Sequence, residues 1–195
     1  MPRVTARAWP LPEEPAPIRL TATIWADTTG LHDDFTNPSD VDAWLDAVGL
    51  DRHGAETTPA EFRRAVHLRD AVRRLVAHVT DDERPAVTSM TVEQAVDTIN
   101  TAATKLPRTQ LELTKHGLQL AATPTASPIT TALAQLARET QHLLTGNGTN
   151  LRACYAPGCV LYFSKTHPRR EWCSITCGNR TRAARHYHST RKSAH

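Results

Sequence analysis

Four cysteines are the residues of this chain with the clearest chemical potential, and all of them lie in its last 45 residues. Four residues separate Cys154 from Cys159, three separate Cys173 from Cys177, and thirteen separate the two pairs. Short loops of this kind bring two thiolates together, and two such pairs satisfy one tetrahedral zinc ion. Because four thiolates leave no open position for a reacting water, we expect a structural zinc and not a catalytic one.

Disulfide bonds are the main alternative for these cysteines, and they require an oxidising compartment. Segment 1–15 has no apolar run of the kind that directs secretion, and no apolar run in the chain is long enough to cross a membrane. We therefore expect a cytoplasmic protein with no membrane partner that holds one structural Zn²⁺. The expected ligands are Cys154, Cys159, Cys173 and Cys177. The nearby histidines His167, His186 and His188 are weaker alternatives, since four thiolates already complete the site.

Charge is distributed unevenly along the 195 residues. Residues 151–195 contain nine Lys or Arg and one acidic residue, a formal charge of +8, whereas residues 1–150 carry a formal −5. A basic segment attached to an acidic one often marks a nucleic-acid partner. The alternative interpretation is a solvated basic surface that binds nothing.

The elements of the first 146 residues are predicted from caps and periodicity. Residues 1–17 are rich in proline and are expected to form a flexible lead-in, while residues 18–30 allow either a strand or a short buried helix. Segments 108–114 and 117–123 alternate with period two around a short turn, which predicts a β-hairpin. Helices are predicted to follow four cap residues, Ser39, Thr58, Thr91 and Ser127.

The body over residues 18–146 is thus predicted to be mainly α with one β-hairpin, an α+β fold. Gly146-Asn147-Gly148 is expected to be a hinge into a zinc module over 150–190. No phosphate loop, nucleophile elbow or metalloprotease motif is present in the sequence, so we do not expect an enzyme. The helix after Thr58 carries arginines that are expected to be solvated and ion-paired: Arg63, Arg64, Arg69, Arg73 and Arg74.

The zinc module is predicted to be treble-clef-like. A short strand over 160–163 leaves the first cysteine pair, and a turn at 166–168 leads back to the second. Ser174 is a suitable helix cap, which places Cys177 in the first turn of a basic C-terminal helix. On that helix Arg182 and Arg185 share a face, because residues three apart are neighbours.

The C-terminal motif Cys177-Gly178-Asn179-Arg180 resembles the CGNR zinc finger, together with Trp172-Cys173-Ser174, Arg169-Arg170 and Tyr162-Phe163. In proteins of this kind the finger follows an ABATE domain, and segment 40–50 is similar to an early helix of that domain. Asp27-Thr28 stands where the ABATE domain is expected to have Asn-Thr. The resemblance implies a stress-induced transcriptional regulator.

The resemblance also implies roles for residues beside the four cysteines. Gly178 is expected to allow close backbone approach behind the metal, and Asn179 to bond backbone near the thiolates. Arg180 has two interpretations, support of the metal loop or a phosphate contact. The expected nucleic-acid contacts are Arg169, Arg170, Arg180, Arg182 and Arg185.

Two functions are consistent with the sequence. The first is a zinc-binding transcriptional regulator whose basic helix contacts phosphates, DNA being favoured over RNA on the description of the family. Its N-terminal domain is then expected to bind a small-molecule ligand or to form a homodimer. The second is a protein-interaction adaptor in which zinc is purely structural. In either case loss of zinc is expected to unfold residues 152–188 and to spare the body.

Overall fold

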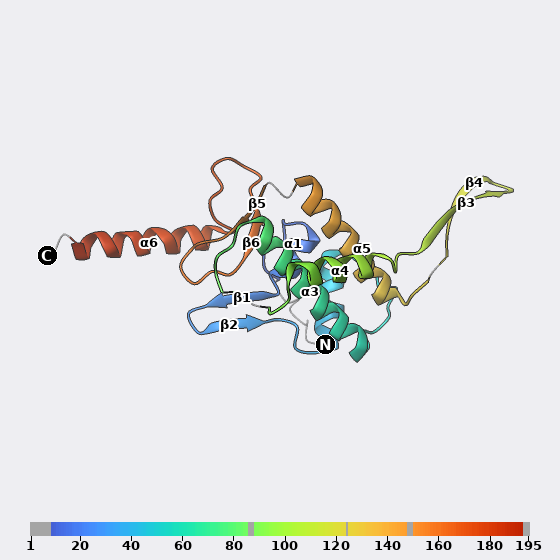
Figure 1. The fold of residues 1–195 in the computed structure, drawn as a ribbon, viewed down its shortest axis with the longest axis horizontal. Helices are drawn as coiled ribbons and strands as arrows, with labels where there is room; N and C mark the ends of the chain where they lie inside the picture. Colours follow the sequence, from blue (N-terminus) through green and yellow to red (C-terminus); the bar gives the residue numbers. More distant parts are fainter. Residues whose placement is uncertain (1–8, 86–87, 124, 148–149, 193–195) are drawn as a thin grey trace, which may run out of the picture.

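The computed structural model of the chain describes residues 9–85, 88–123, 125–147 and 150–192 (Figure 1). Helices dominate, and every strand belongs to a short antiparallel pair, which confirms the predicted fold class. The elements of the body are α1 (Ala16–Thr21), β1 (Ile24–Asp27), β2 (Gly30–Asp33), α2 (Pro38–Val48), α3 (Pro59–Val79), α4 (Val92–Ala103), β3 (Arg108–Thr114), β4 (Gly117–Thr123), α5 (Pro128–His142) and η1 (Leu143–Asn147). The C-terminal module consists of β5 (Leu151–Ala153), β6 (Tyr162–Ser164) and α6 (Ile175–Lys192).

The longer helices of the body begin at side-chain caps. Thr58, Thr91 and Ser127 each accept a hydrogen bond from the backbone N–H three residues later, which confirms three predicted starts. The remaining predicted start, at Ser39, is wrong by two residues, because α2 begins two residues earlier. Its cap is Asn37, whose side chain accepts from the Ser39 N–H at 3.0 Å, because Pro38 occupies the first helical position and lacks an N–H to satisfy.

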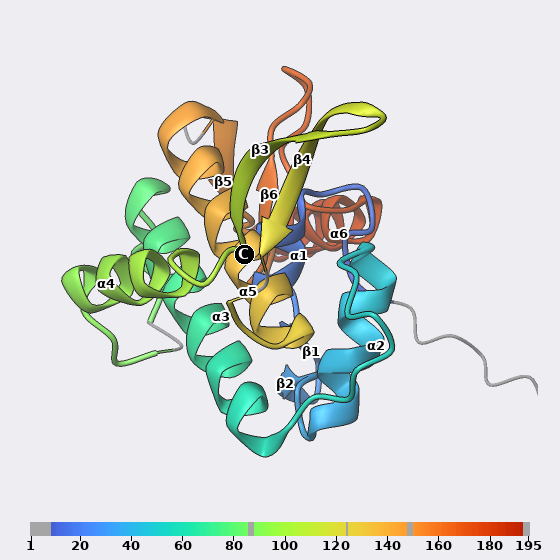
Figure 2. The same cartoon turned by 90° about the vertical axis from the view of Figure 1, so that its right-hand side faces the viewer.

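Helix α3 is the centre of the body. It packs against α1, α2, α4 and α5, and the apolar face of each helix is buried there. Trp44 of α2, Leu68 of α3 and Leu136 of α5 are at most 2 % exposed. Figure 2, viewed from the hairpin end of the molecule, shows β3 and β4 in front of these helices and α6 behind them.

Two hairpins form, and one of them was not predicted. Strands β3 and β4 pair from Arg108 with Thr123 to Thr114 with Gly117, as the alternation indicated. The ambiguous segment 18–30 divides between both alternatives, because α1 ends at Thr21 and β1 begins at Ile24. Its partner β2 was not predicted, and the Trp25 and His32 rings stack with centroids 4.2 Å apart across the pair.

Residues 9–17 pack onto the protein and do not form the flexible lead-in expected for 1–17, of which residues 1–8 lie outside the described residues. Trp9 is 8 % exposed and meets the Phe35 ring edge-on at 6.3 Å. Glu14 is buried and accepts a hydrogen bond from the Ser164 N–H at 2.9 Å. Sequence analysis could not predict that Trp9 and Glu14 are buried, because they lie in a proline-rich segment without periodicity.

The C-terminal module shares its core with the body. Leu151, Ala153 and Tyr162 from β5 and β6 belong to the same buried cluster as α1, α3 and α5. Of the predicted hinge, Gly146 and Asn147 lie in η1, a π-helical turn that continues α5, and Gly148 is outside the described residues. The junction that the structure describes is therefore a packed interface between β5–β6 and the helices.

Candidate metal centre and basic helix

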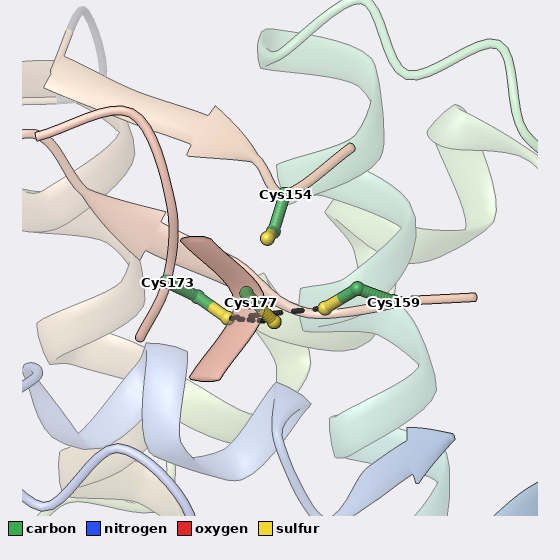
Figure 3. A group of neighbouring side chains, drawn as sticks. All are labelled: Cys154, Cys159, Cys173 and Cys177. Atoms are coloured by element: carbon green, nitrogen blue, oxygen red, sulfur yellow. Dashed lines mark hydrogen bonds between the residues drawn. The ribbon is translucent and has the colours of Figure 1, made fainter. Parts of the chain in front are cut away.

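The four cysteines gather at one buried point where the module meets the body (Figure 3). Their sulfur atoms all lie within 4.8 Å of one another, with 3.8 Å between Cys159 and Cys173 and 3.4 Å between Cys173 and Cys177. Zinc–sulfur bonds of about 2.3 Å in a tetrahedron place sulfur atoms about 3.8 Å apart. The spacing thus fits one zinc ion, and no disulfide joins these cysteines.

Each cysteine is held by its local backbone. Cys154 follows β5, and its N–H donates to the Leu161 carbonyl at 2.9 Å, which closes the first loop. Gly158 has φ +73°, a left-handed conformation that lets the chain turn just before Cys159. Cys173 precedes α6 and Cys177 lies in its first turn, with its N–H donating to the Ser174 hydroxyl at 3.2 Å.

The protonation of the cluster calls for a cation. Hydrogen bonds from Cys159 and then Cys173 lower the pKa of Cys154 to about 2. The hydrogen bond with Cys154 raises the pKa of Cys159 to about 12, and hydrogen bonds with Cys154 and Cys159 raise that of Cys173 strongly. One thiolate is therefore favoured and further ionisation is opposed by proximity. A divalent ion would supply the charge that lets all four thiols release their protons.

The residues of the CGNR motif support the metal centre in different ways. The Arg180 guanidinium donates to the Cys177 sulfur at 3.1 Å, and this bond raises the pKa of Arg180. A Cβ on Gly178 would lie 3.1 Å from Trp172 Cδ1, so glycine allows the Trp172 ring to pack against α6. Asn179 differs from expectation, because it is exposed and accepts a hydrogen bond from Arg182.

Two arginines of the body hold the metal-binding loop, and sequence analysis missed this role. Arg84 donates from Nη1 to the carbonyls of Cys154 at 3.0 Å and Cys159 at 2.6 Å, so it contacts the backbone of two ligands. Arg73 donates to the Val160 carbonyl at 3.2 Å. We call Arg73 and Arg84 the arginine clamp.

The arginine clamp is itself anchored by buried polar partners. Arg84 forms an ion pair with Asp82 at 2.6 Å, and the Asp82 side chain is 3 % exposed. The Tyr162 hydroxyl donates to the same carboxylate at 2.8 Å. Both clamp guanidinium groups lie over the Tyr162 ring at 5.4 Å. The ring, the carboxylate and the two cations form one network between α3 and β6.

Two of the five arginines of α3 differ from the prediction of a solvated surface, whereas Arg63 and Arg64 are exposed as predicted. Arg69 and Arg73 are 2 % and 3 % exposed, and Arg69 pairs with both oxygens of Asp33. Arg73 also donates to the Thr21 carbonyl at the end of α1. Arg69 directly follows the core residue Leu68, and Arg73, four residues later, directly follows the core residue Val72. That position beside the apolar stripe is the signal that could have identified them.

Arg170 was expected to contact nucleic acid, but its guanidinium binds partners within the protein. It pairs with Glu14 at 2.7 Å and donates to the Ser164 and Cys173 carbonyls at 3.0 Å each. Its guanidinium carbon also lies 5.0 Å from the centre of the Phe163 ring. These contacts fasten the lead-in segment to the second cysteine pair.

Helix α6 leaves the metal centre and projects from one end of the molecule (Figure 1). Cys177, Gly178 and Thr181 are buried at its start, whereas Arg182 and Arg185 are exposed. Arg169 in the preceding loop is exposed as well, and its N–H donates to His167 Nδ1, so the His167 ring stands outside the cysteine cluster. His186 is exposed, and the side chain of His188 is outside the described residues.

A cavity of about 870 Å³ lies between α3, α4 and the start of α5. Two pairs of its polar groups bond to each other: Glu61 accepts from Ser127, and Arg64 donates to Thr130 at 3.1 Å. Asp27 and Thr28 are not among its lining residues: Asp27 ends β1 and Thr28 follows it in the turn to β2, and both are exposed.

In the described residues no helix is long and apolar enough to cross a membrane.

Comparison with known families assigns both parts of the chain. Residues 14–147 match the ABATE model, described as "Putative stress-induced transcription regulator", and residues 150–189 match the CGNR zinc finger. A search of curated proteins gave no match. The second match agrees with the four converging thiols, which establishes one structural zinc site. The chain therefore belongs to the ABATE family and ends in a CGNR zinc finger.

Proposed function

We propose that this chain is a nucleic-acid-binding regulator that contacts DNA phosphates through α6, with zinc holding the start of that helix. The supporting observation is the charge and exposure of α6. The helix contains five Lys or Arg and no acidic residue, and of its side chains only those near the metal are buried among the described residues. An 18-residue helix is about 27 Å long. The major groove of DNA is wide enough to admit an α-helix.

The basic residues divide into two groups. Arg182 and Arg185 point from the exposed part of α6, and Arg169 lies exposed in the loop before it, so these three are the proposed phosphate contacts. Arg180 is half-buried against the Cys177 sulfur, and we assign it to the metal centre. Arg170 is excluded because the Glu14 carboxylate already neutralises it. Few side chains remain to distinguish bases, so most of the affinity is expected to be electrostatic.

The test is fluorescence anisotropy with the zinc-loaded full chain and labelled random duplex DNA across a salt series. Three to four neutralised phosphates predict a log–log slope of about −2.7 to −3.6. Arg182→Gln with Arg185→Gln is expected to reduce the slope by about 2 and to weaken binding at low salt. Arg63→Gln with Arg138→Gln is the matched control, since both arginines are exposed on the body.

A duplex RNA probe of the same length tests the preference for DNA, and tighter binding to RNA would reverse it. If the wild-type chain binds neither probe at low salt, the proposal is wrong and the adaptor hypothesis gains support. The same conclusion follows if the Arg182/Arg185 variant binds as tightly as the body control.

A further inference from the structure

A small cavity lies beside the arginine clamp, where α3 meets the C-terminal module. Its volume is about 40 Å³, and four charged side chains line it: Arg73, Arg74, Arg84 and Asp82. Three positive charges against one negative charge leave a formal +2 around the space. We call this space the arginine cavity.

The one carboxylate of the arginine cavity is already fully engaged. One oxygen of Asp82 accepts from the Arg84 backbone N–H at 3.1 Å and from Arg84 Nε at 2.7 Å. The other oxygen accepts from Arg84 Nη2 at 2.6 Å and from the Tyr162 hydroxyl at 2.8 Å. The charge of Asp82 is therefore matched by that of Arg84, and the two arginines of α3 are left without a carboxylate from these walls.

Arg73 is a buried cation that this arrangement does not balance. It is 3 % exposed, and in the part of the chain that the structure describes no carboxylate lies within ion-pair distance of it. Its two Nη groups donate to the carbonyls of Thr21 and Val160, whereas its buried Nε has no hydrogen-bond partner. Burial lowers the pKa of Arg73. Buried charges in proteins normally have a partner of opposite sign.

Two further donors of the arginine cavity are unused among the described residues. Arg74 is half-buried and lacks the ion pair expected of it, because Asp70 pairs with Arg69 at 3.2 Å. Glu93 of α4 feels the charge of Arg74, but it is exposed and forms no ion pair with it. The Thr88 hydroxyl oxygen accepts from a backbone N–H at 3.3 Å, which leaves its hydrogen for another acceptor.

We propose that the arginine cavity binds one small inorganic anion of the size of chloride, held by Arg73 Nε, the Arg74 guanidinium and the Thr88 hydroxyl. The sign follows from the walls, because water could satisfy the donors but would leave the positive charge unbalanced. The size follows from the volume. One water needs about 10–15 Å³ of such space, so about 40 Å³ holds about three atoms of that size. Sulfate, phosphate and organic acids are too large.

The position of this anion connects it to the metal centre. Arg84 donates to the carbonyls of Cys154 and Cys159, and Arg73 donates to that of Val160. Both clamp guanidinium groups lie 5.4 Å from the centre of the Tyr162 ring, so they repel each other across a short distance. An anion beside them would reduce that repulsion and hold the arginine clamp on the metal-binding loop.

Differential scanning calorimetry of the zinc-loaded full chain without nucleic acid tests the proposal separately from DNA binding. Sodium chloride is compared with sodium isethionate, an organic sulfonate too large for the cavity, at equal ionic strength so that screening is the same. Chloride at about ten times its dissociation constant shifts the unfolding equilibrium about tenfold. In a chain of this size that shift corresponds to a melting temperature about 3–6 °C higher, which we expect at about 200 mM chloride.

Three variants locate the effect. Arg74→Gln removes a half-buried cation from the cavity, and Thr88→Val removes a donor without changing the charge. Both are expected to lose at least half of the chloride-dependent rise. Arg63→Gln, an exposed arginine of the same helix, is the matched control and is expected to keep the whole rise. Equal melting temperatures of the wild type in the two salts, or a full chloride effect in the Arg74→Gln variant, overturn the proposal.

Discussion

Arg84→Met is expected to weaken both the fold and the zinc site, because Arg84 connects them. The substitution keeps most of the aliphatic volume and removes the guanidinium. Asp82, whose side chain is 3 % exposed, then loses its cation, and the carbonyls of Cys154 and Cys159 lose their donor. Breaking a fully buried ion pair costs about 3–5 kcal/mol.

The size of the effect follows from the exposure of Arg84. Its side chain is 21 % exposed, so water replaces part of what is lost, and we expect about 2–4 kcal/mol less stability. Loss of support for two ligands typically reduces metal affinity about 10–100-fold. Because Arg84 contacts the backbone of these ligands and not their sulfur atoms, a value near tenfold is expected.

Urea unfolding and competition with a chromophoric zinc chelator measure the two quantities. Arg63→Met removes an exposed arginine of α3 and serves as the control, with an expected change within about 0.5 kcal/mol and no effect on zinc. If Arg84→Met destabilised the protein but left zinc affinity at the wild-type value, the proposed coupling between body and metal would be refuted.

Three further predictions concern the same junction. Zinc removal is expected to lower the melting temperature of the helical body by about 5 °C or more, because Leu151 and Tyr162 complete its core; calorimetry that shows the body melting at its zinc-loaded temperature would contradict this. Burial, and then the hydrogen bond to Asp82, raise the pKa of Tyr162 from 10.0 to about 12. The folded state keeps a proton that the unfolded state releases in this range, so the stabilisation is complete below pH 10 and is lost as the pH rises to 12. Tyrosinate absorbance should show one of three tyrosines titrating near pH 12, and Tyr162→Phe should abolish that step. Gly178→Ala is expected to be about 1–3 kcal/mol less stable than Gly146→Ala in urea, since a Cβ meets Trp172 only at the first position; equal stabilities would contradict the close packing.

Local chemistry accounts for what the sequence predicts well. A cap and an apolar stripe define a helix within a few residues, so α3, α4 and α5 begin where Thr58, Thr91 and Ser127 indicate. The β3–β4 register follows from alternation around a short turn. The cysteine pairs are equally local, because each pair is set by one loop or one helical turn.

The arginine clamp depends on contacts that sequence spacing does not reveal. Arg84 reaches carbonyls 70 and 75 residues away, and Arg73 reaches one 87 residues away. A charged residue beside an apolar stripe resembles an ordinary surface residue until a partner covers it. The interface of β5–β6 with the helices is hidden from the sequence for the same reason, so the sequence gives no cause to expect that the body depends on zinc.

The placement of α6 and the β3–β4 hairpin at opposite ends of the molecule has a consequence for how the chain would engage DNA (Figure 1). A duplex held along α6 would lie at the end of the molecule away from the hairpin. The hairpin would then stay outside the DNA footprint and remain accessible to other molecules while DNA is bound.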